Sequence, residues 1–208
     1  MELIAAAGRG DIVKVRKLLS KRCDINAVDN NGNSSLHKAA LNENIDIVQY
    51  LVNKGCDINA VNKKGYTPLH YAARNGNIDI VQYLVDKGCD INAVDNDGNT
   101  PLHKAVLNGN IDIVQYLVNK GCEINAVDNY GNTPLHKAAM KYGDIDIVQY
   151  LIKDVILMLW IKMATLLYIK LNCMEVLKFY AILLIMKIKL DLRDQQATLK
   201  MNHLSLSA

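Results

Sequence analysis

The chain has 208 residues, of which 50% are hydrophobic and 22% charged, so it is long enough for one domain with a core and an extension. Its net charge is +3, but residues 1–151 carry 16 Lys and Arg against 17 Asp and Glu. Such a near-neutral body offers no basic stripe, and we expect no nucleic-acid partner. The opening MELIAAAGRGDIV is acidic and too short in apolar residues for a secretory signal, so we expect a cytoplasmic protein.

The central part of the chain repeats itself. Glycines recur every 33 residues, at Gly32, Gly65, Gly98 and Gly131, and the segments that they open are nearly identical. A fixed period of this length is typical of solenoid proteins, in which each repeat buries its apolar face only against its neighbours.

Each segment predicts two short helices and an extended arm. In GYTPLHYAARNG, Thr67 is a good N-cap, Pro68 suits the first helical position, and Gly76 can end the helix in the left-handed conformation. Asn77 then caps a second helix over IDIVQYLVD. The arm DINAVDND follows. Spacing predicts that the second helix buries one apolar stripe, formed by Ile78, Val81, Leu84 and Val85.

This pattern resembles the ankyrin repeat, whose unit of 33 residues opens its first helix with T-P-L-H-x-A-A. The resemblance implies an all-α fold, an ankyrin-repeat solenoid of paired antiparallel helices with hairpin-like arms. We expect an N-terminal capping repeat at 1–31, repeats at 32–64, 65–97 and 98–130, an incomplete repeat at 131–152, and a non-repeat tail at 153–208.

Two ladders of reactive residues also follow the period, one of cysteines and one of histidines. Neighbouring units packed about 10 Å apart leave equivalent cysteines too distant for a disulfide. Neither ladder has the close spacing of a zinc site, and no nucleophile lies at motif spacing from a base. We therefore expect no enzyme activity, no cofactor and no metal. The resemblance assigns the histidines to hydrogen bonds with the backbone of their own and the neighbouring unit.

The resemblance further implies a non-catalytic scaffold that binds a protein partner through the concave face, made of the arm tips and first helices. The second full unit differs most from the others there, and we expect a monomer that binds an unidentified protein at this unit. The candidate residues are Lys63, Lys64, Tyr66, Tyr71 and Arg74, followed by Lys104, Tyr130, Lys137, Lys141 and Tyr142. The alternative interpretation is neutral divergence at exposed positions after duplication of the unit.

The tail is hydrophobic and basic, which raises the alternative of a membrane-associated protein directed by residues 153–208. Its long uncharged runs, such as FYAILLIM at 179–186, fall well short of the about 20 residues that a spanning helix needs. Because of this short length, we expect no membrane span. Lysines that flank such runs would still allow a helix to lie in the membrane interface.

A different origin explains the tail. Residues 153–170 read KDVILMLWIKMATLLYIK where another repeat is due. Suitable synonymous codons for these residues, read from one nucleotide earlier, encode KGCDINAVDKDGNTPLHK, which is a further repeat unit. The unique codons of Met158, Trp160 and Met163 fit this reading. We infer a frameshift near Ile152, and a natural shift would make the chain the product of a decayed gene.

Sequencing of the genomic DNA and the transcript across the codons for Tyr150 to Val155 tests this inference. We expect the nucleotides that follow to encode a repeat unit in the shifted frame. Codons for 153–170 that give no repeat in any other frame would refute it.

Overall fold

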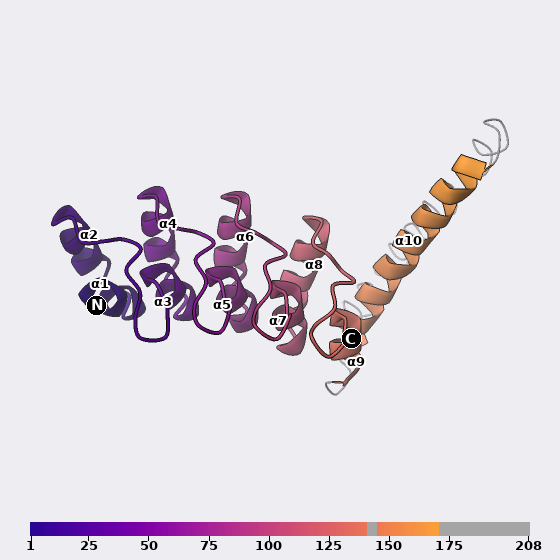
Figure 1. Cartoon of the computed structure of the whole chain (residues 1–208), viewed down its shortest axis with the longest axis horizontal. Helices are drawn as coiled ribbons and strands as arrows, with labels where there is room; N and C mark the ends of the chain where they lie inside the picture. Colours follow the sequence, from indigo (N-terminus) through magenta and orange to yellow (C-terminus); the bar gives the residue numbers. More distant parts are fainter. Residues whose placement is uncertain (141–144, 171–208) are drawn as a thin grey trace, which may run out of the picture. The chain divides into compact units, whose positions relative to one another are not determined.

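The computed structural model describes residues 1–140 and 145–170. The chain divides into two compact units, Met1–Val155 and Ile156–Ala208. The first unit is an array of antiparallel helix pairs joined by extended arms (Figure 1). The described helices are α1 (Glu2–Gly8), α2 (Ile12–Ser20), α3 (Ser35–Leu41), α4 (Ile45–Asn53), α5 (Pro68–Asn75), α6 (Ile78–Asp86), α7 (Pro101–Leu107), α8 (Ile111–Asn119), α9 (Pro134–Met140) and α10 (Ile145–Lys170).

Helix α5 shows why these sequences form short helices. The Thr67 hydroxyl accepts a hydrogen bond from the backbone N–H of His70, and His70 Nδ1 accepts one from the backbone N–H of Thr67. Pro68 occupies the first turn, and Gly76 ends the helix at a φ of 84°, a left-handed conformation that suits glycine. The predicted capping of this unit is confirmed, including the cap of α6 by the Asn77 side chain.

Like helices stack on like helices along the array. Each of α1, α3, α5 and α7 contacts the next first helix, and each of α2, α4 and α6 contacts the next second helix. The largest side chains of the core recur once per unit. Those fully buried in the second helices form two series, one of isoleucines and one of leucines: Ile47, Ile80, Ile113 and Ile147, and Leu51, Leu84, Leu117 and Leu151. The stacked solenoid predicted from the 33-residue period is therefore confirmed.

One detail of the predicted core was wrong. On α6 the fully buried apolar residues are Ile80, Val81 and Leu84, whereas Ile78 and Val85 are only partly buried. Ile78 is the first residue of the helix and lies at the edge of the packed face. The 3.6-residue period identifies which residues are apolar neighbours, but not which of them faces the adjoining unit.

Each arm is a hairpin-like turn that also hydrogen bonds to the preceding arm. A backbone N–H near its tip donates to the carbonyl four residues later, as Asn62 does to Tyr66 at 3.0 Å. Between arms, the N–H of Lys63 donates to the carbonyl of Asn31 at 3.0 Å, and Asn96 bonds in the same way to Lys64. Backbone hydrogen bonds thus hold the row of arm tips in register.

Buried histidines tie each unit to the next. Within the first helices, His37, His70 and His103 lie fully buried beside their Ser or Thr caps. The Nε2 atom of each lies 2.8–3.1 Å from the carbonyl oxygen of the residue 29 positions later, in the following arm. The ladder therefore has the role that the family resemblance implies.

Helix α10 departs from this plan. Helix α8 ends at Asn119, two residues before Gly121 with a φ of 80°, but Val155 stands at the position equivalent to Gly121. A β-branched residue disfavours the left-handed conformation, and the helix runs to Lys170. Among the described residues, no helix is long and apolar enough to cross a membrane.

The histidine ladder predicts that acid weakens the array. Burial lowers the pKa of His37, His70 and His103, while the carbonyl partner of each acts to raise it. The unfolded chain, with histidine pKa values of about 6.5, binds more protons below that pH than the folded chain does. The stability contributed by the neutral histidines is therefore complete above about pH 6.5 and declines as the pH falls.

Urea denaturation at about pH 7.5 and about pH 5.5 measures this effect, with an expected loss of at most about 1.4 kcal/mol per pH unit for each buried histidine. The His70→Gln variant should show a smaller loss than the wild type over the same range, because it lacks one of the three groups. Stability that is unchanged or greater at the lower pH would contradict the prediction.

Candidate binding surface

The arm tips of the array carry a repeated ion pair with the first helices. In three units an Asp at the arm tip contacts a Lys nine residues later, on the next first helix: Asp29–Lys38 at 3.1 Å, Asp95–Lys104 at 2.5 Å and Asp128–Lys137 at 2.5 Å. Each aspartate also accepts hydrogen bonds from nearby backbone N–H groups. The pairs thus fasten the arms to the helices.

These contacts engage two of the predicted binding residues in ion pairs. Lys104 is only 6% exposed, and its ammonium group lies against Asp95 and over the ring of Tyr66, 4.7 Å from the centroid. Lys137 is partly exposed and pairs with Asp128. Their charges are already balanced within the chain, so they contribute little free cationic surface.

Opposite charges also shift the titration of these groups. Burial raises the pKa of Asp29, but hydrogen bonds from Asn33 and Lys38 lower it to about 2. Burial likewise opposes both charges of the Asp95–Lys104 pair, yet their mutual contact leaves the pKa of Asp95 below and that of Lys104 above its usual value. Asp29, Asp95 and Lys104 are therefore ionised at neutral pH.

The second full unit replaces this ion pair with a neutral one. Asn62 stands where the other arms have Asp, and Tyr71 stands where the other helices have Lys. The Asn62 side-chain N–H donates to Asn33 Oδ1 at 2.7 Å and to the Tyr71 hydroxyl at 3.0 Å. Asn62 Oδ1 accepts from the backbone N–H groups of Lys64 and Tyr66. The arm is fastened as in the other units, but without charge.

Two aromatic rings and an arginine lie beside this pair. The rings of Tyr66 and Tyr71 are 5.2 Å apart between centroids, and Tyr66 also stacks on His70 at 5.5 Å. The exposed Arg74 holds its guanidinium group 5.6 Å from the centroid of Tyr71. Tyr and Arg are the residue types that most often dominate the energy of protein interfaces.

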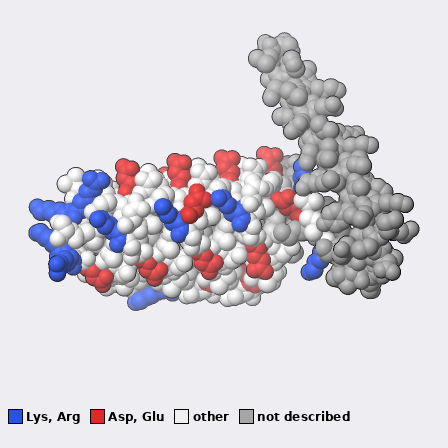
Figure 2. Space-filling model, turned by 90° about the horizontal axis from the view of Figure 1, so that it is seen from above, with Lys and Arg blue, Asp and Glu red and all other residues white. Residues whose placement is uncertain are grey.

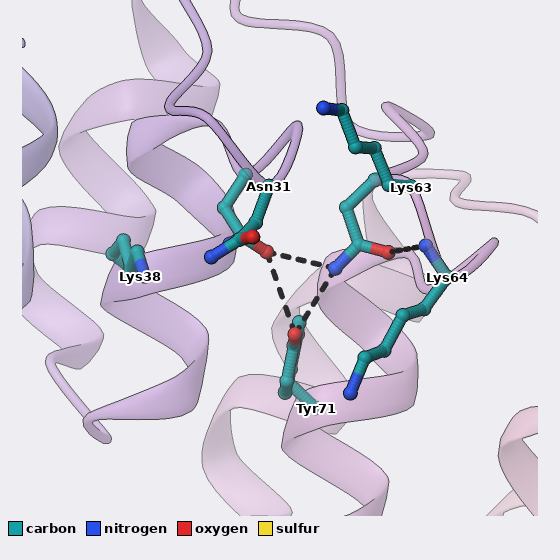
Figure 3. Close-up of a pocket in the computed structure, with 7 residues that line it drawn as sticks. Asn31, Lys38, Lys63, Lys64 and Tyr71 are labelled. Atoms are coloured by element: carbon teal, nitrogen blue, oxygen red, sulfur yellow. Dashed lines mark hydrogen bonds between the residues drawn. The ribbon is translucent and has the colours of Figure 1, made fainter.

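A pocket of about 330 Å³ opens next to these residues (Figure 3). In Figure 3 Tyr71 lies between Lys38 on one side and Lys64 on the other. Lys63 and Lys64 are exposed, and within the described part of the chain neither ammonium group takes part in a hydrogen bond or an ion pair. The lining residues are Asn31, Asn33, Lys38, Asn62, Lys63, Lys64 and Tyr71.

The structure thus brings together Lys63, Lys64, Tyr66, Tyr71 and Arg74, which we call the second-unit surface. Tyr130, 78% exposed, is not among the residues that line the pocket. Lys141 and Tyr142 fall outside the described residues.

Sequence reasoning missed the asparagines that shape the pocket, Asn31, Asn33 and Asn62. The useful signal was the paired change of Asp to Asn at position 62 and of Lys to Tyr at position 71. Comparing single columns of the repeat could not show that these two positions touch.

Three cysteine thiols of the array are poorly suited to nucleophilic chemistry, and the charged residues that the structure describes do not form a metal site. Burial raises the pKa of the Cys56, Cys89 and Cys122 thiols to about 12, and a protonated thiol is a poor nucleophile. Over residues 1–140 and 145–170, no group of three or more His, Cys, Asp or Glu is placed to hold a metal ion.

The fold and the surface together define a solenoid of stacked helix pairs that presents side chains from successive arms. The family model for ankyrin repeats (3 copies) matches residues 3–95 and 87–158. The chain therefore belongs to the ankyrin repeat family, whose members are typically non-catalytic modules that bind other proteins. Among the curated proteins, none matches the chain significantly.

Substitution at positions 128 and 137 can reproduce the neutral Asn62–Tyr71 pair in another unit. Asn99 is the equivalent of Asn33, but its buried Oδ1 has no hydrogen-bond donor, because Asp128 is a carboxylate. Asp128→Asn alone leaves Lys137 without its counter-charge and should cost about 1–3 kcal/mol. The new amide can donate to Asn99 Oδ1, as Asn62 donates to Asn33, and adding Lys137→Tyr removes the unpaired charge and supplies a hydroxyl like that of Tyr71, so the double variant should recover most of that loss.

Urea denaturation of the wild type, both single variants and the double variant gives the coupling energy between positions 128 and 137. A double variant whose loss equals the sum of the two single losses would contradict this account of the neutral pair.

Proposed function

We propose that the protein is a non-catalytic scaffold whose partner protein docks on the second-unit surface. The observation that carries this proposal is the concentration of unengaged cations and clustered tyrosines on one unit of an otherwise uniform array. Lys63 and Lys64 are exposed, and neither ammonium group pairs with another side chain among the residues that the structure describes, whereas the lysines at positions 38, 104 and 137 pair with aspartates.

The geometry favours binding over neutral divergence. Asn62 and Tyr71 both differ from the Asp and Lys of the other units, and their hydrogen bond keeps the arm fixed in the absence of that carboxylate. Random divergence at exposed positions does not require matched changes at two contacting positions. The tyrosines combine apolar area with few rotatable bonds, so ordering them on binding has a small entropic cost.

The test compares full-length baits in affinity capture from the source cells. Lys63→Glu/Lys64→Glu reverses both free cations of the surface. Lys54→Glu/Lys87→Glu is a control of identical composition and net charge, since Lys54 and Lys87 are exposed residues at the ends of α4 and α6.

A genuine partner should be captured by the wild type and the control, and at least about tenfold less by Lys63→Glu/Lys64→Glu, because both cations become repulsive. Thermal unfolding of all three proteins checks that the array remains folded. If every captured protein binds the two double variants equally, the partner does not dock on this surface.

A further inference from the structure

We propose that the pocket of the second unit takes a carboxylate side chain, Asp or Glu, from an extended acidic segment of the partner protein. This inference rests on the proposed function and adds the chemistry of the partner.

The charge balance of the pocket is the first argument. Its lining includes Lys38, Lys63 and Lys64 but no Asp or Glu. At the arm-tip position where the other units carry an aspartate, this unit carries the neutral amide of Asn62. The aspartate of the preceding arm, Asp29, already pairs with Lys38 at 3.1 Å. Lys63 and Lys64 therefore have no carboxylate of their own, and an incoming anion would supply one.

The floor of the pocket is the second argument. Asn62 is 7% exposed and uses its amide fully, as a donor to Asn33 and Tyr71 and as an acceptor from two backbone N–H groups. These contacts hold Tyr71 in place between Lys38 and Lys64 (Figure 3). A fixed polar floor with the exposed ammonium groups of Lys63 and Lys64 beside it suits a short acidic side chain more than an apolar one.

The neighbouring surface decides between a peptide and a nucleic acid. The two unpaired lysines lie at one arm tip, and the tips on either side have no basic residue, since they read DNN at 29–31 and DND at 95–97. A polynucleotide requires basic groups along many phosphates. On the face seen in Figure 2, rows of acidic side chains also run along the array, and basic ones gather at the end that carries α1 and α2. A short acidic peptide needs only the two lysines of the tip at 62–64.

Selection from a phage library of random peptides tests the inference, using the immobilised full chain. Three proteins are screened: the wild type, Lys63→Glu/Lys64→Glu and the control Lys54→Glu/Lys87→Glu. We expect the wild type and the control to enrich Asp and Glu at two or more adjacent or alternate positions. The Lys63→Glu/Lys64→Glu variant should lose these peptides at least about tenfold and enrich Lys and Arg instead.

The outcomes separate the two proposals. Enriched peptides that need Lys63 and Lys64 but lack acidic residues would overturn the carboxylate site and leave docking on this surface intact. Peptides bound equally by both double variants would overturn the proposed function as well. A fluorescein-labelled polythymidine that binds the wild type as tightly as the best acidic peptide, and depends on the same lysines, would replace the peptide with a nucleic acid.

Discussion

The fold depends on the inability of a single helix pair to bury its own apolar face. A unit of 33 residues has helices of seven to nine residues, too short to be stable alone in water. Side chains such as Leu69 and Leu84 are removed from solvent only because the next pair covers them. The hydrogen bond from each buried histidine to the following arm adds a directional tie to this apolar contact. Stability therefore resides in the interfaces between units, as expected for a solenoid.

This constraint divides the chain into positions that must repeat and positions that are free to differ. The buried histidines and the core leucines are engaged between units, so changes there would weaken those interfaces. The ion pair between the arm tip and the first helix is also engaged, but it can be exchanged for a neutral pair of similar reach. At Asn62 and Tyr71 this exchange keeps the arm hydrogen-bonded to its neighbours, and it changes only the charge of the surface. A scaffold of this kind acquires a specific binding site without loss of its fold.

Most of the architecture could be predicted from the sequence, because the repeat aligns capping and core residues in fixed columns. Thr67, Pro68 and Gly76 indicate one helix with both its ends, and the 33-residue period indicates the stack. The candidate surface was predicted less completely. The sequence showed that position 104 carries a lysine, but its burial against Asp95 depends on how far an arm folds back over the next helix. Spacing along the chain does not report that distance.

The same reasoning explains where the regular array ends. In the first three complete helix pairs that carry the histidine, its partner carbonyl lies in an arm 29 residues later. The residue 29 positions after His136 is Thr165, which lies within helix α10 rather than in an arm. Val155 stands where a glycine would end the helix, so no arm forms at that point. The repeat pattern therefore supplies the fourth full unit with a neighbouring repeat on one side only. The second unit, with neighbours on both sides, is the better place for a rigid binding surface.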